Sequence, residues 1–312
     1  MKSNQLWLSR RQFVSTVSLA MMSLILNPWQ LKAARASMLR KTIPGNAESL
    51  PVIGLGSSRT FDVGSGAPEI EHFVALIKEF FALGGELIDS SPMYGAAEQV
   101  IGTLLDRGGG RDRLFAATKV WTDGEQAGIR QMESSAQKWG VDRFDLMQIH
   151  NLRDWKTHLK TLNAWKEAGK VRYIGITTSH GRSHRELETI LRQEQFDFVQ
   201  LSYNIEDRSV EKRLLPLAAD RGIGVLVNRP YQRGSLFRSV KGKPLPDWAA
   251  EFDCHSWGQF FLKYIVSHPA VTCAIPATTK LHHLQDNMAA GTGRQPDAMM
   301  RKKMEDFFAA LS

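Results

Sequence analysis

The chain has 312 residues, of which 43% are hydrophobic, 9% aromatic and 23% charged. This composition is typical of a globular protein with a full core, and it excludes a disordered chain. The formal net charge of +8 does not indicate nucleic-acid binding, because residues 1–36 hold five basic residues and no acid. The rest of the chain therefore carries only a mild positive excess.

The N-terminal segment predicts an export signal. The twin-arginine pattern Ser9-Arg-Arg-Gln-Phe-Val14 precedes an apolar run at 16–26 and a small-residue cleavage site, Ala34-Arg-Ala36. We expect the twin-arginine translocation machinery as a partner, cleavage after Ala36 and a periplasmic location. If the signal is not used, residues 1–36 form a basic amphipathic tail of a cytoplasmic protein. The apolar run is shorter than the roughly twenty residues that span a bilayer, so no stable membrane anchor is predicted.

The remaining residues, 37–312, alternate between short apolar runs and amphipathic helical patterns, without an internal repeat or a linker. Helical patterns follow each of the first seven runs, and two more, at about 280–290 and 297–310, follow the eighth. Residues 229–256 interrupt this order and predict a long loop rather than a second domain. The order predicts an α/β fold, a single-domain (β/α)8 TIM barrel. Its strands are expected at residues 52–57, 87–89, 114–120, 144–149, 171–177, 196–202, 224–227 and 271–275.

The two cysteines, Cys254 and Cys273, say little about the cellular compartment. Cys273 lies in an apolar run that predicts a buried strand, so we interpret it as a core thiol. A disulfide between the two remains the alternative in a periplasmic protein. No Cys or His spacing typical of metal ligands occurs, so no metal site is predicted.

Three successive predicted strands end in polar residues that can carry chemistry. Asp89, Lys119 and His150 each close an apolar run, and Tyr94 lies in the loop after Asp89. The strand ends of a parallel barrel meet at one rim, where catalytic groups of such barrels lie. Each residue alone is as well explained as a loop anchor, a salt bridge or a packed histidine. Their joint placement favours a catalytic site.

These residues belong to motifs that resemble the aldo-keto reductase family over residues 50–290. The resemblance implies a (β/α)8 barrel that reduces an aldehyde or ketone with a nicotinamide cofactor, NADP being favoured over NAD. The motifs, each at a strand end and in the family's order, are Asp89-Ser-Ser-Pro-Met-Tyr-Gly95 with Glu98, Thr118-Lys119, Gln148-Ile-His150, Gly175-Ile-Thr-Thr178, Gln200-Leu-Ser-Tyr-Asn204, Gly222-Ile-Gly-Val-Leu226 and Ile275-Pro276 through Asn287.

The resemblance also implies a catalytic tetrad of Asp89, Tyr94, Lys119 and His150. Carbonyl reduction needs a proton donor, and an ordinary tyrosine, with a pKa of about 10, is a poor acid at neutral pH. We expect the Lys119 ammonium to lower the pKa of Tyr94, and Asp89 to keep Lys119 charged. His150 is expected to orient the substrate carbonyl by a hydrogen bond. Glu98 has a plainer alternative role in stabilising its helix dipole.

The cofactor residues carry over with departures from the family pattern. Asn228-Arg229-Pro230 stands where an aromatic commonly stacks on the nicotinamide, and Arg229 is expected to contact the diphosphate instead. After the eighth strand, Ala277 and His283 replace the family's two basic positions. The predicted cofactor residues are Thr177, Thr178 and Gln200 for the carboxamide, Asn228 and Arg229 at the seventh strand, and Thr278, Thr279, Lys280, His283 and Asn287 at the adenosine phosphate.

The substrate is predicted only as a small aldehyde or ketone, with Trp121 and Tyr203 as pocket residues. Two alternatives remain: a Schiff-base aldolase-type barrel using Lys119, and a nucleotide-loaded binding or sensing module with little turnover. A soluble nicotinamide pool is not expected outside the cytoplasm. An exported reductase of this kind is therefore expected to fold around its cofactor before transport.

Overall fold

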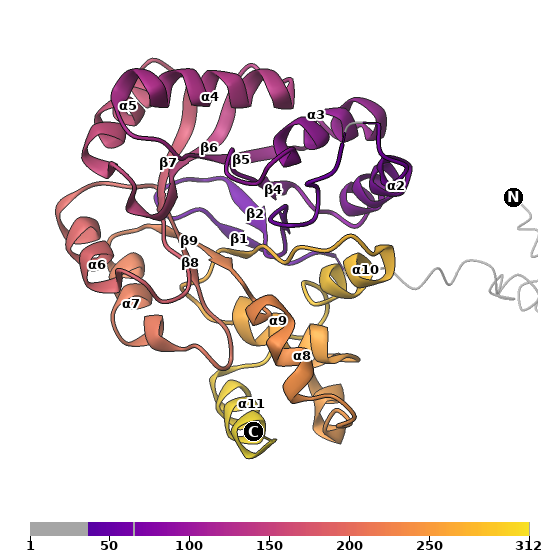
Figure 1. Cartoon of the computed structure of the whole chain (residues 1–312). Helices are drawn as coiled ribbons and strands as arrows, with labels where there is room; N and C mark the ends of the chain where they lie inside the picture. The colour runs from indigo at the N-terminus through magenta and orange to yellow at the C-terminus, as the bar shows by residue number, and fades with distance from the viewer. Residues whose placement is uncertain (1–36, 65, 312) are drawn as a thin grey trace, which may run out of the picture. The chain divides into compact units, whose positions relative to one another are not determined.

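The computed structural model describes residues 37–64 and 66–311, and its centre is a parallel β-barrel (Figure 1). Eight strands pair in chain order, each parallel to the next. The first and last are joined by a bridge between Ile53 and Ala274, where the Gly54 amide donates to the Ala274 carbonyl at 2.9 Å. The predicted (β/α)8 fold is therefore confirmed. The strands are β3 (Leu55–Gly56), β4 (Leu87–Asp89), β5 (Phe115–Val120), β6 (Phe144–Ile149), β7 (Val171–Thr177), β8 (Phe198–Ser202), β9 (Gly224–Asn228) and β10 (Cys273–Ala274).

Amphipathic helices surround these strands (Figure 1). In α2, Ile70, Phe73, Ile77 and Phe80 recur every three or four residues and are buried on the face toward the barrel. Gly140 ends α4 in the left-handed conformation that glycine adopts without strain, with φ of 62°. The helices are α2 (Glu69–Ala82), α3 (Ala97–Gly108), α4 (Glu125–Trp139), α5 (Trp155–Glu167), α6 (His184–Gln193), α7 (Leu214–Asp220), α9 (Trp257–Val266), α10 (Leu281–Ala289) and α11 (Ala298–Leu311).

Two predicted segments differ in detail from the structure. The helical pattern predicted after the sixth strand is divided into a 3-10 turn, η2 (Ser209–Lys212), and α7. Pro216 has no amide proton to continue one helix and is tolerated only in the first turn. The predicted loop at 229–256 contains short helical pieces rather than none. These are η3 (Gln232–Gly234), α8 (Ser235–Ser239) and η4 (Asp247–Phe252).

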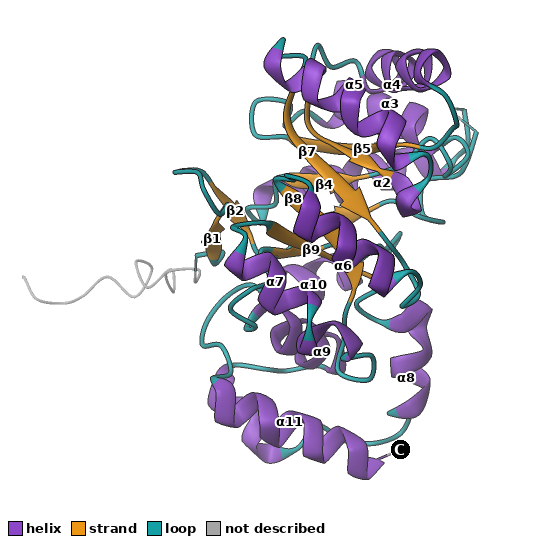
Figure 2. Cartoon of the chain, turned by 90° about the vertical axis from the view of Figure 1, so that its left-hand side faces the viewer, coloured by secondary structure: helices purple, strands orange, loops and turns teal. Residues whose placement is uncertain are grey.

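A hairpin that the sequence analysis did not predict precedes the barrel. Strand β1 (Arg40–Thr42) pairs antiparallel with β2 (Ser49–Pro51). Its buried Ile43 and Leu50 join the apolar side chains inside the barrel. The hairpin therefore closes the end where the strands begin, and Figure 2 shows it opposite α8.

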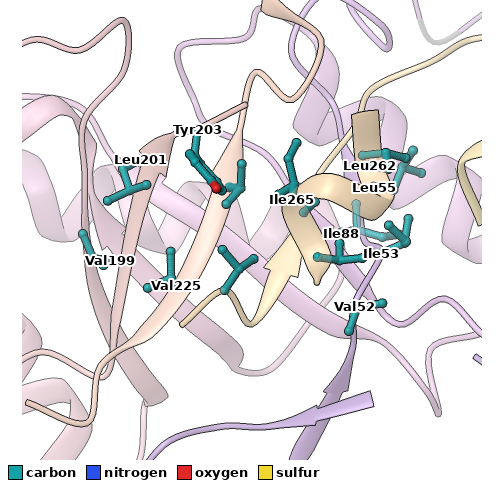
Figure 3. Close-up of a cluster of buried hydrophobic side chains, with 14 of the residues drawn as sticks. Val52, Ile53, Leu55, Ile88, Val199, Leu201, Tyr203, Val225, Leu262 and Ile265 are labelled. Atoms are coloured by element: carbon teal, nitrogen blue, oxygen red, sulfur yellow. The ribbon is translucent and has the colours of Figure 1, made fainter. Parts of the chain in front are cut away.

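The core has two parts, one inside the barrel and one between the strands and the helices. The inner part includes Phe115, Leu146 and Phe198. Figure 3 shows a section of the outer part, where Leu262 and Ile265 of α9 lie among strand residues. Both parts consist mainly of branched aliphatic and aromatic side chains, as expected for barrel layers.

Cys254 and Cys273 are buried free thiols, as predicted for Cys273. Within 37–64 and 66–311, no helix has the length and apolar character needed to span a bilayer. The same residues contain no cluster of three or more His, Cys, Asp or Glu arranged for a metal ion.

Candidate active site

The structure brings Asp89, Tyr94, Lys119 and His150 together at the carboxyl ends of β4, β5 and β6. Asp89 is the last residue of β4, Lys119 lies one residue before the end of β5, and His150 directly follows β6. Asp89, Tyr94 and His150 line a cavity of about 910 Å³ at this end of the barrel. Lys119 is fully buried beside it.

The charged pair of the site is buried. Lys119 Nζ lies 2.5 Å from Asp89 Oδ2, with side-chain exposures of 0% and 3%, and it also donates to the Ser90 carbonyl at 2.7 Å. Burial by itself would lower the pKa of Lys119, but the Asp89 carboxylate raises it above its ordinary value. The ammonium therefore stays charged inside the protein.

Two amides hold the second oxygen of Asp89. Gln148 Nε2 and Gln200 Nε2 each donate to Asp89 Oδ1 at 2.9 Å. With Lys119 at the other oxygen, these donors satisfy the ionised carboxylate. Gln200, expected only at the cofactor carboxamide, thus also supports the charged pair.

Tyr94 is half-buried at the cavity wall, with Lys119 Nζ 5.5 Å from the centre of its ring. Burial is the largest influence and raises the pKa of Tyr94, while the Lys119 charge opposes it. The net shift is opposite to the lowering that the sequence analysis expected. The physical reason is that removing the phenolate from water costs more free energy here than its attraction to the Lys119 ammonium recovers. Tyr94 is therefore protonated at neutral pH.

His150 packs edge-on against Tyr94, with ring centres 5.9 Å apart. Burial, together with the Lys119 charge, lowers the pKa of His150 to about 3, so the imidazole is neutral. Its Nδ1 lies 2.9 Å from Ser91 Oγ. If the Ser91 hydroxyl donates to Nδ1, the ring proton is on Nε2, which can then donate to a carbonyl oxygen.

Glu98 is buried behind the cavity rather than exposed at its helix end. Its carboxylate accepts from Thr118 Oγ1 at 2.6 Å and from Ser135 Oγ at 2.8 Å, and burial raises its pKa. Glu98 therefore links α3 to β5 and α4 by hydrogen bonds, a structural role beyond the expected interaction with its helix dipole. Its contacts support the strand that carries Lys119.

Five predicted cofactor residues, Thr177, Thr178, Gln200, Asn228 and Arg229, line the cavity. Several of their polar atoms are buried without a hydrogen-bond partner: Thr178 Oγ1, Arg229 Nε and Arg229 Nη1. Buried polar atoms are normally paired, so this part of the cavity suits a polar ligand. These residues fit the nicotinamide cofactor that the sequence motifs imply.

The predicted phosphate residues near α10 lie outside the cavity lining. Thr278 Oγ1 accepts from the Lys280 amide at 3.1 Å, and the Thr279 carbonyl contacts His72 Nε2 at 2.6 Å. Asn287 Oδ1 accepts from the Tyr231 hydroxyl at 2.6 Å and is used inside the fold. Lys280 precedes the first residue of α10, and His283 contacts its neighbour His282.

Of the two predicted substrate residues, only Trp121 lines the cavity. Its ring centre is 5.0 Å from that of His150, and the Arg153 guanidinium lies 4.8 Å from the Trp121 ring. The indole therefore forms a wall directly beside the group expected to orient the substrate.

The prediction that Tyr203 lines the substrate pocket is wrong. Side chains alternate along β8, so Gln200 faces the barrel interior whereas Leu201 and Tyr203 face the helices. Tyr203 lies in the outer core (Figure 3), and its hydroxyl bonds to Glu211 and accepts from Arg301 Nη2 at 2.7 Å. Its role in the structure is packing.

Several cavity residues were missed by the sequence analysis. Tyr231 and Phe237 add aromatic surface shortly after Arg229, where the sequence showed no stacking residue directly after the seventh strand. Arg59, Arg182 and Arg233 also line the cavity. Their shared signal is position: each is a basic residue in a loop that follows a barrel strand.

A barrel of this order with Tyr, Lys, Asp and His at one rim defines a class of carbonyl-reducing enzymes, and sequence comparison agrees. The model of the Aldo/keto reductase family matches residues 52–305, so this chain belongs to the aldo/keto reductase family.

Particular relatives extend the comparison. Methylglyoxal reductase YeaE from Escherichia coli (strain K12) is 29% identical over 252 residues, which cover 77% of this chain and 85% of that protein. Aldo-keto reductase YhdN from Bacillus subtilis (strain 168) is 27% identical over 220 residues, 64% of this chain and 63% of that protein. A crystal structure of an aldo/keto reductase from Klebsiella pneumoniae in complex with NADP and acetate has a TM-score of 0.73 at 23% identity, covering 86% of this chain and 96% of that one. This likeness supports the fold.

Proposed function

We propose that the protein is an NADPH-dependent reductase of small aldehydes or ketones, with Tyr94 as the proton donor. The observation that carries this proposal is the buried Lys119–Asp89 pair, which lies beside Tyr94 at the wall of the cavity. The names of the E. coli and K. pneumoniae proteins, which mention methylglyoxal reduction and NADP, support the substrate class and the cofactor.

Thr177, Thr178 and Gln200 would hold the carboxamide of the cofactor, and Arg229 would neutralise its diphosphate. The unpaired Thr178 hydroxyl and Arg229 nitrogens support this assignment. Thr278, Thr279, Lys280, His283 and Asn287 are kept as the adenosine-phosphate residues, outside the cavity lining. NADP remains favoured over NAD. A bound reduced nicotinamide supplies the hydride that adds to the carbonyl carbon.

The protein's own groups manage the charge on the carbonyl oxygen. His150 Nε2 donates a hydrogen bond that orients this oxygen, and Tyr94 transfers its phenolic proton to it as negative charge develops. Lys119 stabilises the phenolate that remains, and Asp89 keeps Lys119 charged. The phenolate then takes a proton from solvent at the open cavity.

No observation favours the two alternatives. A Schiff base needs a neutral, accessible amine, whereas Lys119 is buried, charged and hydrogen-bonded to Asp89 and Ser90. A sensing module needs only to bind the cofactor. It has no use for a proton donor such as Tyr94 or for the charged Lys119–Asp89 pair beside it.

The proposal includes export. Residues 1–36 would act as a twin-arginine signal removed after Ala36, which leaves residues 37–312 as a periplasmic enzyme that folds around its cofactor before transport. The sequence pattern at Arg10 and Arg11 supports this; both residues lie outside the described part of the chain. Changing both to lysine should keep the protein in the cytoplasm. Undiminished periplasmic protein in that variant would contradict the export proposal.

The reductase proposal is tested by NADPH titration, followed by fluorescence, of the chain that begins at Ser37. Methylglyoxal serves as the first carbonyl. Wild type and Tyr94→Phe should bind NADPH equally, while Tyr94→Phe loses about 10²–10⁴-fold in turnover. Absence of NADPH binding in both would remove the cofactor assignment.

A further inference from the structure

Ser91 joins the loop of Tyr94 to His150. Its Oγ lies 2.9 Å from His150 Nδ1 and accepts from the Met93 amide at 3.3 Å. Its carbonyl accepts from the Tyr94 amide at 2.9 Å. Ser91 therefore contacts both residues that would meet the substrate carbonyl, the proton donor and the orienting imidazole.

The neighbouring serine does not share this arrangement. Ser90 Oγ accepts from Ser57 Oγ at 2.8 Å, and within the described residues its hydroxyl bonds to no member of the tetrad. Ser90 and Ser91 are equally buried, each at 0% exposure. The contact with His150 is thus a property of Ser91 and not of the serine pair as a whole.

The burial of Ser91 decides which group donates between its Oγ and His150 Nδ1. A serine hydroxyl has one proton and two lone pairs. The Met93 amide occupies one lone pair, and within residues 37–64 and 66–311 the hydroxyl has His150 Nδ1 as its single acceptor. If Nδ1 carried the ring proton, the Ser91 proton would be buried without an acceptor, a state that folded proteins avoid. Ser91 therefore donates, and Nδ1 accepts.

An accepting Nδ1 determines the form of the imidazole. A neutral imidazole carries one ring proton, which must then be on Nε2. Burial and the Lys119 charge lower the pKa of His150 to about 3, which keeps the ring neutral near pH 7. His150 lines the cavity, and its Nε2 makes no hydrogen bond to the described residues. The Nε2 proton is therefore available to a ligand in the cavity.

We propose that Ser91 is a positioning residue for carbonyl reduction, because its hydroxyl keeps the His150 proton on the nitrogen that can reach the substrate oxygen. The role in reduction rests on the proposed reductase function, whereas the position of the proton does not. Through the Met93 and Tyr94 amides, the same residue also holds the loop of the proton donor. Ser91 thus presents two donors, the Tyr94 hydroxyl and His150 Nε2, to one carbonyl oxygen.

The test reads the position of the His150 ring proton directly. The full chain is labelled with 15N in its histidines, and long-range 1H–15N correlation spectra at pH 7 separate a protonated ring nitrogen from an unprotonated one. The chain has nine histidines, so His150→Gln identifies the His150 signals by their loss. NADPH affinity and kcat/KM for methylglyoxal are measured for the same proteins.

Two variants isolate the hydroxyl. Ser91→Ala removes it, and Ser91→Thr keeps a hydroxyl at the same position. Ser135→Ala is the matched control, because Ser135 is also 0% exposed and its hydroxyl also donates to a single side chain, Glu98, at 2.8 Å. Ser135 lies outside the cavity lining.

We expect the wild-type ring proton on Nε2, with Nδ1 unprotonated. In Ser91→Ala both neutral tautomers should be populated, and kcat/KM should fall by about two- to tenfold, the effect of one hydrogen bond, with NADPH affinity unchanged. Ser91→Thr should keep the wild-type tautomer and kcat/KM. Ser135→Ala should leave the His150 signals and kcat/KM unchanged, whatever it costs in stability.

Two results would overturn the inference. A wild-type proton on Nδ1 would show that His150 donates to Ser91, a result that needs no variant. Unchanged His150 signals in Ser91→Ala would show that Ser91 does not set the tautomer, even if turnover falls. If wild type reduces no carbonyl, the reductase proposal fails instead, and the signals of wild type and Ser91→Ala still decide whether Ser91 sets the His150 tautomer.

Discussion

Replacing Lys119 with methionine removes one charge of the buried pair and leaves the Asp89 carboxylate without its cation. Breaking a buried ion pair from one side costs about 3–5 kcal/mol, because the remaining charge is uncompensated. Here the pair is 2.5 Å apart and at most 3% exposed, but Asp89 Oδ1 keeps two amide donors at 2.9 Å. We therefore expect Lys119→Met to lower the free energy of unfolding by about 3 kcal/mol, the lower part of that range.

The assay is urea unfolding of the chain that begins at Ser37, with NADPH oxidation measured in parallel. A loss of about 3 kcal/mol moves the midpoint by about 1 M urea at a slope of about 3 kcal/mol/M. Adding Asp89→Asn to Lys119→Met removes the stranded charge and should recover most of the stability. Turnover should be lost in both variants, because neither has a charged Lys119 to stabilise the Tyr94 phenolate.

Two results would refute this reasoning. If Lys119→Met and the double variant unfold at the same midpoint, the charge of Asp89 is not what destabilises the single variant. If Lys119→Met keeps the wild-type rate of NADPH oxidation, Lys119 has no part in proton transfer, whatever its effect on stability.

Three further predictions concern other parts of the chain. The pKa of His150 is about 3 in the folded protein against 6.5 in the unfolded chain, so the contribution of the neutral imidazole to stability should be complete above pH 6.5 and fall as the pH decreases toward 3. Urea midpoints measured across this pH range should fall less in His150→Gln, which lacks the titrating group, than in wild type. Tyr203→Phe should leave kcat/KM and NADPH affinity unchanged but cost about 1–3 kcal/mol, because Arg301 loses a buried acceptor. In Gly102→Ala the new Cβ would lie 2.0 Å from the Lys138 carbonyl oxygen, so thermal unfolding should show a loss of about 1–3 kcal/mol or more.

Most of the barrel could be predicted because its central strands are buried on both faces. Strands β6 and β7 begin and end at the predicted residues, because a mostly apolar run of six or seven residues can be recognised without knowing which strand it pairs with. The hairpin of β1 and β2 was missed because each strand has three residues and too few apolar positions to show a period. Its stability comes from contacts with the barrel interior, which a local pattern does not contain.

The site was predictable where it follows strand ends and not where it depends on loops. Asp89, Lys119 and His150 could be placed at one rim from strand order alone. Tyr203 was misplaced because the alternation along β8 was not followed beyond Ser202. The direction of the Tyr94 pKa shift depends on how much solvent the surrounding loops exclude. Arg182 and Arg233 could not be placed at the cavity from the sequence, because their positions depend on the paths of their loops, which sequence spacing does not give.

The bridge between Ile53 and Ala274 has a consequence for how the protein folds. The barrel becomes a closed cylinder only when its first and last strands meet, and few hydrogen bonds join them: Gly54 to Ala274, Ala274 to Val52, and Gly56 to Pro276. Contacts between such distant segments form slowly, because the loss of chain entropy precedes the gain in contacts. The ribosome must therefore synthesise nearly the whole polypeptide before the first and last strands can pair. Until then the residues proposed to hold the cofactor on either side of it have no fixed distance between them, so the proposed export of a folded protein must follow the closure of the barrel.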